Sequence, residues 1–397
     1  MPNREEKRNL ESIPVGSLRM IPLEGCIDLG HKIDEYLVRW RTERENEHKN
    51  SLAFAGYQRD SYILDAQINR FGTGEAKGVI NESVRGTDLY ILVDITNYSL
   101  TYKLCGQENH MSPDDHYQDL KRIIAAVGGK ARRITVIMPF LYESRQHKRS
   151  ARESLDCALA LQEMVRMGVD NIITFDAHDP RVQNAIPLSG FETVRPAYQF
   201  VKGLLNSVHD LKIDAEHMML ISPDEGGMSR AIYLANMLGL DMGMFYKRRD
   251  YTQIVDGRNP IVSHEFLGTS VEGKDVLVVD DMISSGESVL DVARQLKKRK
   301  ASRIFIAATF GLFTKGLKAF DDAYNDGVID KVLTTNLVYQ MPELFEKPYY
   351  VSCDMSKYIA YIIDTLNHDT SISDLLNPFE RIHNLVNKYN QGLLPEK

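Results

Sequence analysis

Short apolar runs alternate with longer amphipathic stretches between about residues 60 and 360. The runs that predict strands are 89–93, 134–138, 171–175, 218–221, 276–279, 304–308 and 332–334. Apolar side chains recur at helical spacing between several of these runs, at 154–167, 227–238 and 286–299. Strands that are apolar along their whole length are typical of a parallel sheet covered by helices on both faces. The pattern therefore predicts an α/β fold.

Two stretches in the first half of the chain are echoed in the second half. Residues 86–94 resemble residues 273–281, and residues 131–140 resemble residues 301–310. Either pair alone is compatible with chance, but two pairs in the same order favour duplication. A chain of 397 residues also has the length of two domains.

We therefore predict two similar domains, an N-terminal one at 51–200 and a C-terminal one at 201–350. Residues 1–50 are a predicted helical extension, because apolar residues recur at near-helical spacing over 27–40. The charged run at 41–50 is interpreted as a solvated face or a linker. Residues 351–397 are predicted to be C-terminal helices that pack on the N-terminal domain.

Charge and cysteine content narrow the class of protein. Lys and Arg number 48 and Asp and Glu number 55, which gives a net charge of −7 and argues against a general nucleic-acid or membrane-surface binder. The four cysteines are scattered without a CxxC pair, and no apolar run has the roughly 20 residues that span a bilayer. We expect a soluble cytoplasmic protein with no nucleic-acid or membrane partner.

The most specific stretch of the chain is the loop that follows the apolar run 276–279. The run ends in two acidic residues, and small polar residues then lead into a predicted helix: Asp280, Asp281, Ser284, Ser285, Gly286 and Ser288. Ligands of open α/β sheets bind at the carboxyl ends of strands, and a helix N-terminus favours phosphate. Adjacent carboxylates suit ribose hydroxyls, directly or through Mg²⁺. No Walker motif occurs, and an ordinary turn with capping serines is the alternative.

This loop resembles the phosphoribosyl-pyrophosphate loop of type I phosphoribosyltransferases. The rest of the chain resembles the ribose-phosphate pyrophosphokinase family, whose members have two tandem domains of that fold. Further segments match in the family's order: Arg70–Glu75 with Asn81–Gly86, Pro139–Arg149, Asp176–His178, Ser222–Gly227 and Lys247–Arg249. The resemblance covers about residues 60–360 and implies two phosphoribosyltransferase-like domains.

The resemblance implies a set of site residues. Phe71 and Glu75 would contact the nucleotide of ATP, as would Arg145 and Gln146 in a basic loop. His178 and Asp224 would hold Mg²⁺. The implied catalytic pair is Lys247 and Arg249, which strand alternation places on one side. The implied ribose 5-phosphate site is the loop at 280–288, with Asp280 and Asp281 on the ribose hydroxyls.

The implied reaction transfers diphosphate from ATP to the C1 hydroxyl of ribose 5-phosphate, giving phosphoribosyl pyrophosphate and AMP. Family members are hexamers built from dimers, which implies a homo-oligomer here. Several positions depart from the family, among them Ser284 in place of Asp, Glu287 in place of Gly and His147 in place of an acid. These departures keep open an inactive regulatory or sensor homologue, and a phosphoribosyltransferase is a third alternative, disfavoured by the ATP-side segments.

Overall fold

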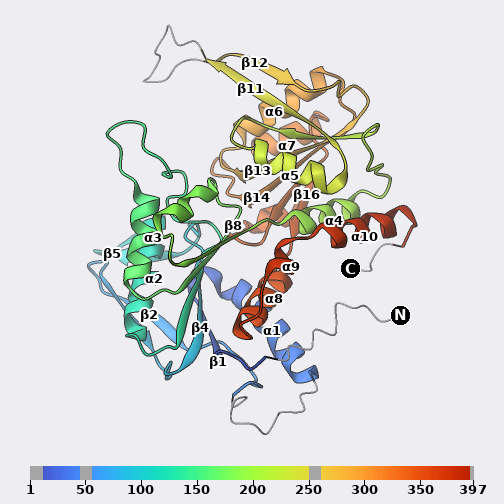
Figure 1. Ribbon diagram of the computed structural model, residues 1–397. Helices are drawn as coiled ribbons and strands as arrows, with labels where there is room; N and C mark the ends of the chain where they lie inside the picture. The colour runs from blue at the N-terminus through green and yellow to red at the C-terminus, as the bar shows by residue number, and fades with distance from the viewer. Residues whose placement is uncertain (1–11, 45–55, 250–260, 394–397) are drawn as a thin grey trace. The chain divides into compact units, whose positions relative to one another are not determined.

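The computed structural model describes residues 12–44, 56–249 and 261–393. For residues 247–249 and 261–264 it describes the backbone alone. The chain divides into two compact units (Figure 1). The first comprises residues up to Arg195 together with 337–339 and 355–377, and the second comprises 196–336, 340–354 and the residues after 377. No helix within these described ranges is long and apolar enough to cross a membrane.

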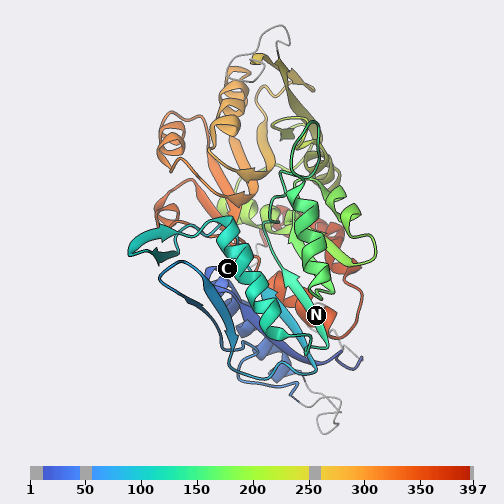
Figure 2. The same ribbon diagram turned by 90° about the vertical axis from the view of Figure 1, so that its left-hand side faces the viewer.

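The first unit is built on a five-stranded, fully parallel sheet. Its strand order is β1 (Ser17–Pro22), β4 (Thr87–Leu92), β7 (Arg133–Ile137), β8 (Asn171–Phe175) and β9 (Gly190–Val194). Helices α2 (Pro113–Val127) and α3 (Asp156–Arg166) cover one face, and α1 (Ile27–Glu43) and α8 (Ser356–Asn367) cover the other (Figures 1 and 2). Two hairpins, β2 (Ala66–Arg70) with β3 (Ala76–Ile80) and β5 (Thr101–Leu104) with β6 (Gln107–His110), lie outside the sheet.

The second unit repeats this plan in a seven-stranded sheet. Five parallel strands follow the same order: β10 (Met218–Ser222), β13 (Asp275–Ile283), β14 (Ile304–Gly311), β15 (Lys331–Thr335) and β16 (Tyr350–Cys353). Beyond β10 lie β11 (Asp241–Arg249), which is parallel to it, and β12 (Ile261–Leu267), which is antiparallel to β11. Both sheets confirm the predicted α/β architecture and the repeated order of its strands.

Alternating residues of the second sheet face two separate apolar cores. Helices α6 (Glu287–Lys298) and α7 (Lys318–Asn325) cover the face that includes Val276 and Val278. Helices α4 (Ala197–Ser207), α5 (Met228–Leu238) and α10 (Phe379–Asn390) cover the face that includes Leu277 and Val279. Because both faces are buried, the strands have the continuous apolar pattern from which they were predicted.

The C-terminal helices are divided between the two units. Helices α8 and α9 (Ser373–Leu376) belong to the first unit. Helix α10 departs from the expectation that residues 351–397 pack on the N-terminal domain, because it packs on α4 and α5 of the second unit. Its buried residues Ile382 and Leu385 join the core of that unit, and the Tyr389 hydroxyl bonds to the backbone of Val208 and Leu211. Helical spacing identified the apolar face of α10 but not the surface that it covers.

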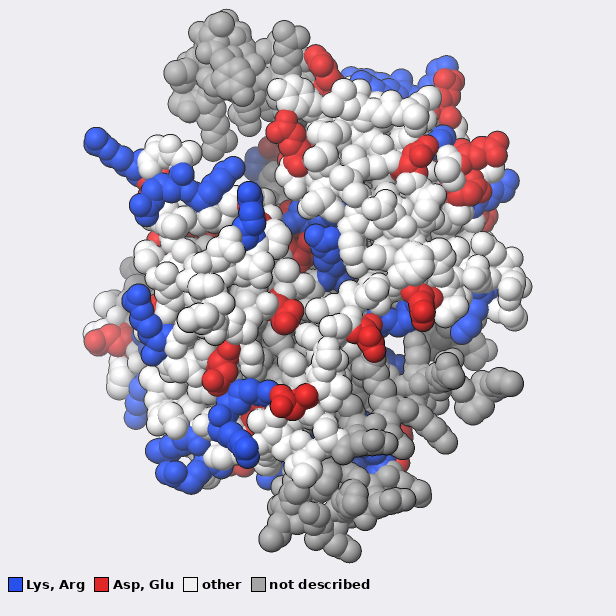
Figure 3. All heavy atoms as spheres, viewed as in Figure 1, with Lys and Arg blue, Asp and Glu red and all other residues white. Residues whose placement is uncertain are grey.

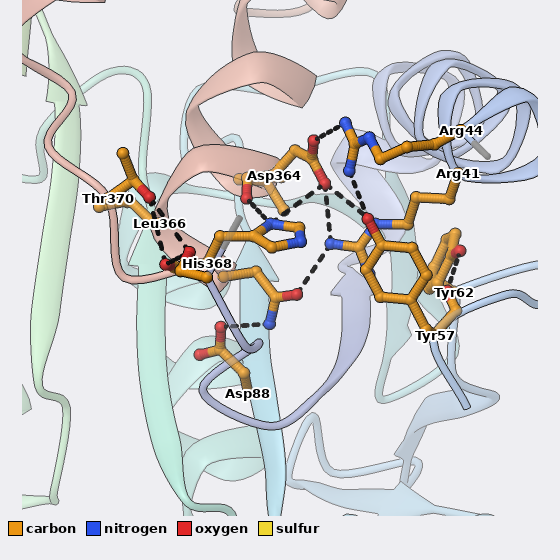
Figure 4. Close-up of polar contacts among 12 residues, drawn as sticks. Arg41, Arg44, Tyr57, Tyr62, Asp88, Asp364, Leu366, His368 and Thr370 are labelled. Carbon is orange, nitrogen blue, oxygen red and sulfur yellow. Dashed lines mark hydrogen bonds and ion pairs between the residues drawn. The ribbon is translucent and has the colours of Figure 1, made fainter. Parts of the chain in front are cut away.

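A buried polar network joins the first and last helices of the first unit (Figure 4). Arg41 of α1 donates from Nε and Nη2 to Asp364 Oδ1 of α8 at 3.0 and 2.9 Å, and Arg44 donates to Asp364 Oδ2 at 2.8 Å. Arg41 also donates to Asn367 Oδ1 at 2.8 Å, and Asn367 in turn donates to Asp88 of the sheet at 2.9 Å. These contacts connect α1, α8 and β4.

This network corrects one expectation from the sequence. The run at 41–50 was interpreted as a solvated face or linker, yet Arg41 is only 1% exposed. Its guanidinium lies over the rings of Tyr57 and Tyr62, at 4.5 and 5.2 Å from the ring centroids. Arg41 can be buried because the carboxylate of Asp364, from a distant part of the chain, pairs with it. The sequence around Arg41 gives no indication of that partner.

Candidate active site

The loop after β13 is held in a fixed shape at the start of α6. Gly286 precedes α6 with φ of +83°, and a side chain there would overlap the ring of Phe320, which is buried. The backbone of 312–314 donates to the carbonyls of Ile283 and Ser284, at 2.9 Å to each. The first amides of a helix have no partner within it, and such a helix start is suited to a phosphate. The phosphate site at this loop stays a prediction.

The two acidic residues at the end of β13 form a crowded pair. Asp281 is buried, and its amide donates to Asp280 Oδ1 at 2.8 Å. Burial raises the pKa of Asp280 well above its ordinary value, and the negative charges of Asp281 and Asp224 raise it further. The structure thus brings Asp224 into the electrostatic range of the pair. Groups that donate hydrogen bonds or carry positive charge, such as ribose hydroxyls or a cation, would stabilise this arrangement.

Arg230 is a residue of this region that the sequence reasoning missed. It lies on α5 with only 7% of its side chain exposed, and its Nη2 is 3.6 Å from Asp281 Oδ2. Only one charged residue, Arg230, occurs in α5, which directly follows Gly226 and Gly227. A single charge on an otherwise uncharged helix is the sequence signal that could have identified Arg230. Its positive charge lies beside the Asp281 carboxylate.

Glu287 adds a negative charge beside the predicted phosphate loop, as the sequence indicated. The structure places Lys315 Nζ 2.6 Å from Glu287 Oε1, and both side chains are exposed. The lysine offsets the added charge locally, so the loop is not left with an unbalanced carboxylate.

The equivalent strand end in the first unit is occupied differently. Asp94 follows β4 and is buried, and burial raises its pKa. Its carboxylate accepts hydrogen bonds from the amide and hydroxyl of Thr96, at 2.8 and 2.7 Å, and from the Tyr339 amide at 2.7 Å. These bonds satisfy Asp94 within its own chain. The first sheet therefore has an acidic residue at the same strand end as the second sheet, but the hydrogen bonds of this residue stabilise a turn.

The hairpin that carries Phe71 and Glu75 is anchored to helix α2. Arg70 donates to Asp119 of α2 at 2.5 Å, and its guanidinium lies 4.3 Å from the centroid of the Tyr102 ring. The turn is closed by a hydrogen bond from the Phe71 amide to the Glu75 carbonyl at 2.7 Å. Phe71 keeps 53% of its surface exposed. An exposed aromatic ring on a fastened turn is suited to stacking on a base.

The basic loop between β7 and α3 carries the other two predicted nucleotide contacts. Arg145 is exposed and Gln146 is partly buried. Lys and Arg side chains gather on this loop in Figure 3, in agreement with the exposure of Lys148, Arg149 and Arg152. The loop offers a concentrated positive charge for a polyphosphate.

His178 lies beside this loop in the first unit. Its ring centroid is 5.4 Å from that of His147, and His147 Nε2 is 3.5 Å from Asp179 Oδ2. Arg181 donates to Asp179 and lowers the pKa of that carboxyl to about 2. Asp176 has φ of +41°, a strained conformation for a residue with a side chain, of the kind found at functional sites.

The predicted metal and catalytic residues are only partly described. His178 belongs to the first unit and Asp224 to the second, so a metal held by both stays a prediction. Among the described residues, no three His, Cys, Asp or Glu side chains are grouped to hold a metal ion. The carboxylate oxygens of Asp280, Asp281 and Asp224 nevertheless suit Mg²⁺, which usually takes one or two protein carboxylates and completes its shell with phosphates and water. Lys247 and Arg249 lie on β11, and their side chains are outside the described residues.

Two units of this architecture, with an acidic strand end and a Ser/Gly loop opening a helix, define a protein of the phosphoribosyltransferase fold class. A family model described as the N-terminal domain of ribose phosphate pyrophosphokinase matches residues 18–168. A second model, for the phosphoribosyl transferase domain, matches residues 191–341. Both matches confirm the predicted fold class.

The comparison with individual proteins gives the family. The ribose-phosphate pyrophosphokinase of Vibrio parahaemolyticus is 30% identical over 318 residues, which are 79% of this chain and 91% of the relative. That of Pasteurella multocida is 31% identical over 315 residues, or 78% and 90% of the two chains. The chain belongs to the ribose-phosphate pyrophosphokinase family. The crystal structure of phosphoribosylpyrophosphate synthetase from Mycobacterium smegmatis has the same fold, with a TM-score of 0.69 and 21% identity over 89% of this chain and 99% of that one.

Proposed function

We propose that this chain transfers diphosphate from ATP to the C1 hydroxyl of ribose 5-phosphate. The observation that carries the proposal is the fixed loop at the start of α6, with Asp280 and Asp281 at its entrance. Family membership supports the ATP side, because the curated relatives are named ribose-phosphate pyrophosphokinases. The products would be phosphoribosyl pyrophosphate and AMP.

In the proposed reaction the C1 oxygen attacks the β-phosphorus of ATP. The bond from that phosphorus to the oxygen bridging to the α-phosphorus breaks, AMP leaves, and the hydroxyl proton passes to solvent. Such phosphoryl transfers depend on positioning and charge stabilisation more than on covalent chemistry. The residues of the chain therefore act mainly by holding the two substrates.

Each predicted residue has a role in this proposal. Ser284, Ser285, Gly286 and Ser288 would hold the 5-phosphate at the N-terminus of α6. Asp280 and Asp281 would accept hydrogen bonds from the ribose hydroxyls, with Asp281 oriented by Arg230.

On the nucleotide side, Phe71 would stack on the base, and Glu75 would bind the nucleoside. Arg145 and Gln146 would bind the phosphates. Lys247 and Arg249 would stabilise the charge that develops on the transferred diphosphate.

Mg²⁺ is the proposed cofactor, with His178 and Asp224 as its proposed protein contacts. When bound, the ion would neutralise the phosphate charge of ATP. The proposed assembly is a homo-oligomer built from dimers, which light scattering of the purified chain would test. A monomer at working concentration would refute it.

One assay tests the function. Purified protein is incubated with ATP, Mg²⁺ and ribose 5-phosphate, and AMP is measured. We expect AMP to form, and Lys247→Ala to reduce its rate by about 10²–10³-fold, the usual loss for one charge-stabilising donor. Lys298→Ala, at the exposed far end of α6, is the matched control and should retain full activity.

The alternatives give different results in the same experiment. A sensor homologue would form no AMP but would bind phosphoribosyl pyrophosphate saturably. A phosphoribosyltransferase would consume phosphoribosyl pyrophosphate in the presence of a base. The Lys315–Glu287 pair favours an active loop over the sensor, because the lysine offsets the added negative charge beside the loop.

A further inference from the structure

A stacked pair of tyrosines connects the basic loop to helix α2. The rings of Tyr142 and Tyr117 lie 4.3 Å apart at their centroids, with only 7° between their planes. The Tyr142 hydroxyl donates to Asp114 Oδ1, in the first turn of α2, at 2.7 Å. Tyr142 lies three positions before Arg145, so the stack fixes the start of the segment that carries the predicted phosphate contacts.

The helix that receives Tyr142 is itself firmly held. Ser112 and Asp115 form a capping box at the start of α2. The Tyr117 hydroxyl lies 3.0 Å from both the Ala160 carbonyl and Glu163 Oε2 of α3, and Lys121 pairs with Glu163 at 2.9 Å. The ring under Tyr142 is thus locked between two helices rather than free to follow the loop.

A second contact lies at the other end of the same segment. His147 has 13% of its side chain exposed, and its Nε2 lies 3.5 Å from Asp179 Oδ2. Asp179 is held in turn by three hydrogen bonds from the side chain of Arg181 and one from its amide. His147 therefore lies beside a carboxylate that already accepts hydrogen bonds from Arg181.

Between the two contacts the backbone is also constrained. The Ser144 amide donates to the Leu141 carbonyl at 3.1 Å, and the Gln146 amide donates to the Glu143 carbonyl at 2.8 Å. The exposed charges of Arg145, Lys148, Arg149 and Arg152 repel one another, which would otherwise favour a spread and mobile loop. The contacts of Tyr142 and His147, one on each side of Arg145 and Gln146, oppose that tendency. We call these two contacts the tethers.

We propose that Tyr142 and His147 are positioning residues that hold Arg145 and Gln146 ready for the phosphates of ATP. The proposal rests on the proposed function, which supplies ATP as the ligand. A segment that is ordered before binding loses less conformational entropy when the nucleotide arrives. The tethers would therefore act on the affinity for ATP and leave the ribose 5-phosphate site, on the other unit, unaffected.

Three variants and a control test the proposal kinetically. Tyr142→Ala removes the ring, Tyr142→Phe keeps the stack but removes the hydroxyl, and His147→Ala removes the second tether. Tyr361→Ala removes a different stacked ring of the same unit, which packs on Trp40 at 4.3 Å. We expect Tyr142→Ala and His147→Ala to raise the KM for ATP about tenfold and to change that for ribose 5-phosphate less than about twofold. Tyr142→Phe should recover most of the affinity, and Tyr361→Ala should behave as the wild type.

A second readout does not depend on catalysis. Trypsin cleaves after Arg145, Lys148 and Arg149, so the rate of limited digestion reports how often this segment opens. We expect digestion within 145–149 to be about tenfold faster in Tyr142→Ala and near the wild-type rate in Tyr142→Phe. If the wild type forms no AMP, the proposed function fails, and ATP binding measured by equilibrium dialysis replaces the KM comparison.

The outcomes separate cleanly. A Tyr142→Ala variant with unchanged digestion, or with unchanged ATP affinity despite faster digestion, overturns the proposal. Equal losses for both substrates, shared by Tyr361→Ala, would indicate a general structural effect and would overturn it as well. Faster digestion together with a selective loss of ATP affinity, both restored in Tyr142→Phe, supports it.

Discussion

Removing the carboxylate at the centre of the α1–α8 network should strongly destabilise the first unit. Asp364 is about 4% exposed in its side chain and accepts from Arg41 and Arg44. In Asp364→Asn the shape of the side chain is kept but its charge is lost. Arg41, with 1% of its side chain exposed, would then be a buried cation without a counterion.

The expected magnitude follows from that burial. Breaking a buried ion pair by removing one partner costs about 3–5 kcal/mol, because the remaining charge stays desolvated. We expect about 3 kcal/mol here, since the amide oxygen of Asn can still accept one bond and Arg44 can reach water. With a urea slope of about 3 kcal/mol/M, the midpoint would fall by about 1 M.

Trp40 makes the measurement specific to this contact. It is the only tryptophan of the chain and stacks on Tyr361 of α8, with 4.3 Å between the ring centroids. Its fluorescence therefore reports the separation of α1 from α8 during urea unfolding. Asp369→Asn is the matched control, because Asp369 is 80% exposed and lies 3.8 Å from Arg133. That substitution should change stability by less than about 0.5 kcal/mol.

The effect of Asp364→Asn should depend on pH in a defined direction. Burial alone would raise the pKa of Asp364, but the charges of Arg41 and Arg44 lower it below its ordinary value. A carboxyl with a lowered pKa stabilises the fold above its unfolded pKa of about 3.9, and this stabilisation is lost as the pH falls through the folded pKa. The wild type and the variant should therefore differ fully at pH 7 and begin to converge as the pH falls below about 4. A variant within about 1 kcal/mol of the wild type at pH 7 would refute the reasoning.

Three further predictions concern the second unit. Gly286→Ala should raise the KM for ribose 5-phosphate by more than about tenfold in the AMP assay, because a side chain at φ of +83° would overlap the Phe320 ring. Asp280→Asn should stabilise the protein by about 1 kcal/mol in thermal unfolding while reducing AMP formation by about a hundredfold, because it removes a buried charge repulsion from the ribose site. Tyr389→Phe should cost about 1–3 kcal/mol and speed hydrogen exchange in α10, because its hydroxyl serves two backbone groups, among them the Leu211 amide at 2.8 Å.

Local patterns predicted the buried strands that carry their own apolar signal, namely β4, β7, β8, β10, β13, β14 and β15. The prediction of a helical extension over residues 1–50 was wrong at β1, which is a buried strand paired with β4. The run at 171–175 coincides with β8, and the other apolar runs lie within strands or extend only slightly past them. The site loop at 280–288 was found for the same reason, since its residues are consecutive. Family resemblance supplied the roles of Arg145 and Gln146, which their exposure alone would not have shown.

Contacts between distant residues were beyond such patterns. Arg41 and Asp364 are separated by 323 positions, and nothing near Arg41 in the sequence indicates that it is buried. The stack of Tyr142 on Tyr117 likewise depends on how α2 packs against the loop, which no spacing within the loop reveals. In both cases one side chain takes its role from a partner that only the folded chain brings near.

The division of the C-terminal segment between the units has a consequence for how the chain is made. Residues 355–377 complete the first unit by bringing Asp364 to Arg41, and α10 then completes one core of the second unit. Domains of multidomain chains usually fold in order from the N-terminus during synthesis. Here neither unit has all its core residues until the ribosome has passed residue 354. Both units can therefore complete their folding only after residues beyond 354 have been synthesised, although they are separate in architecture.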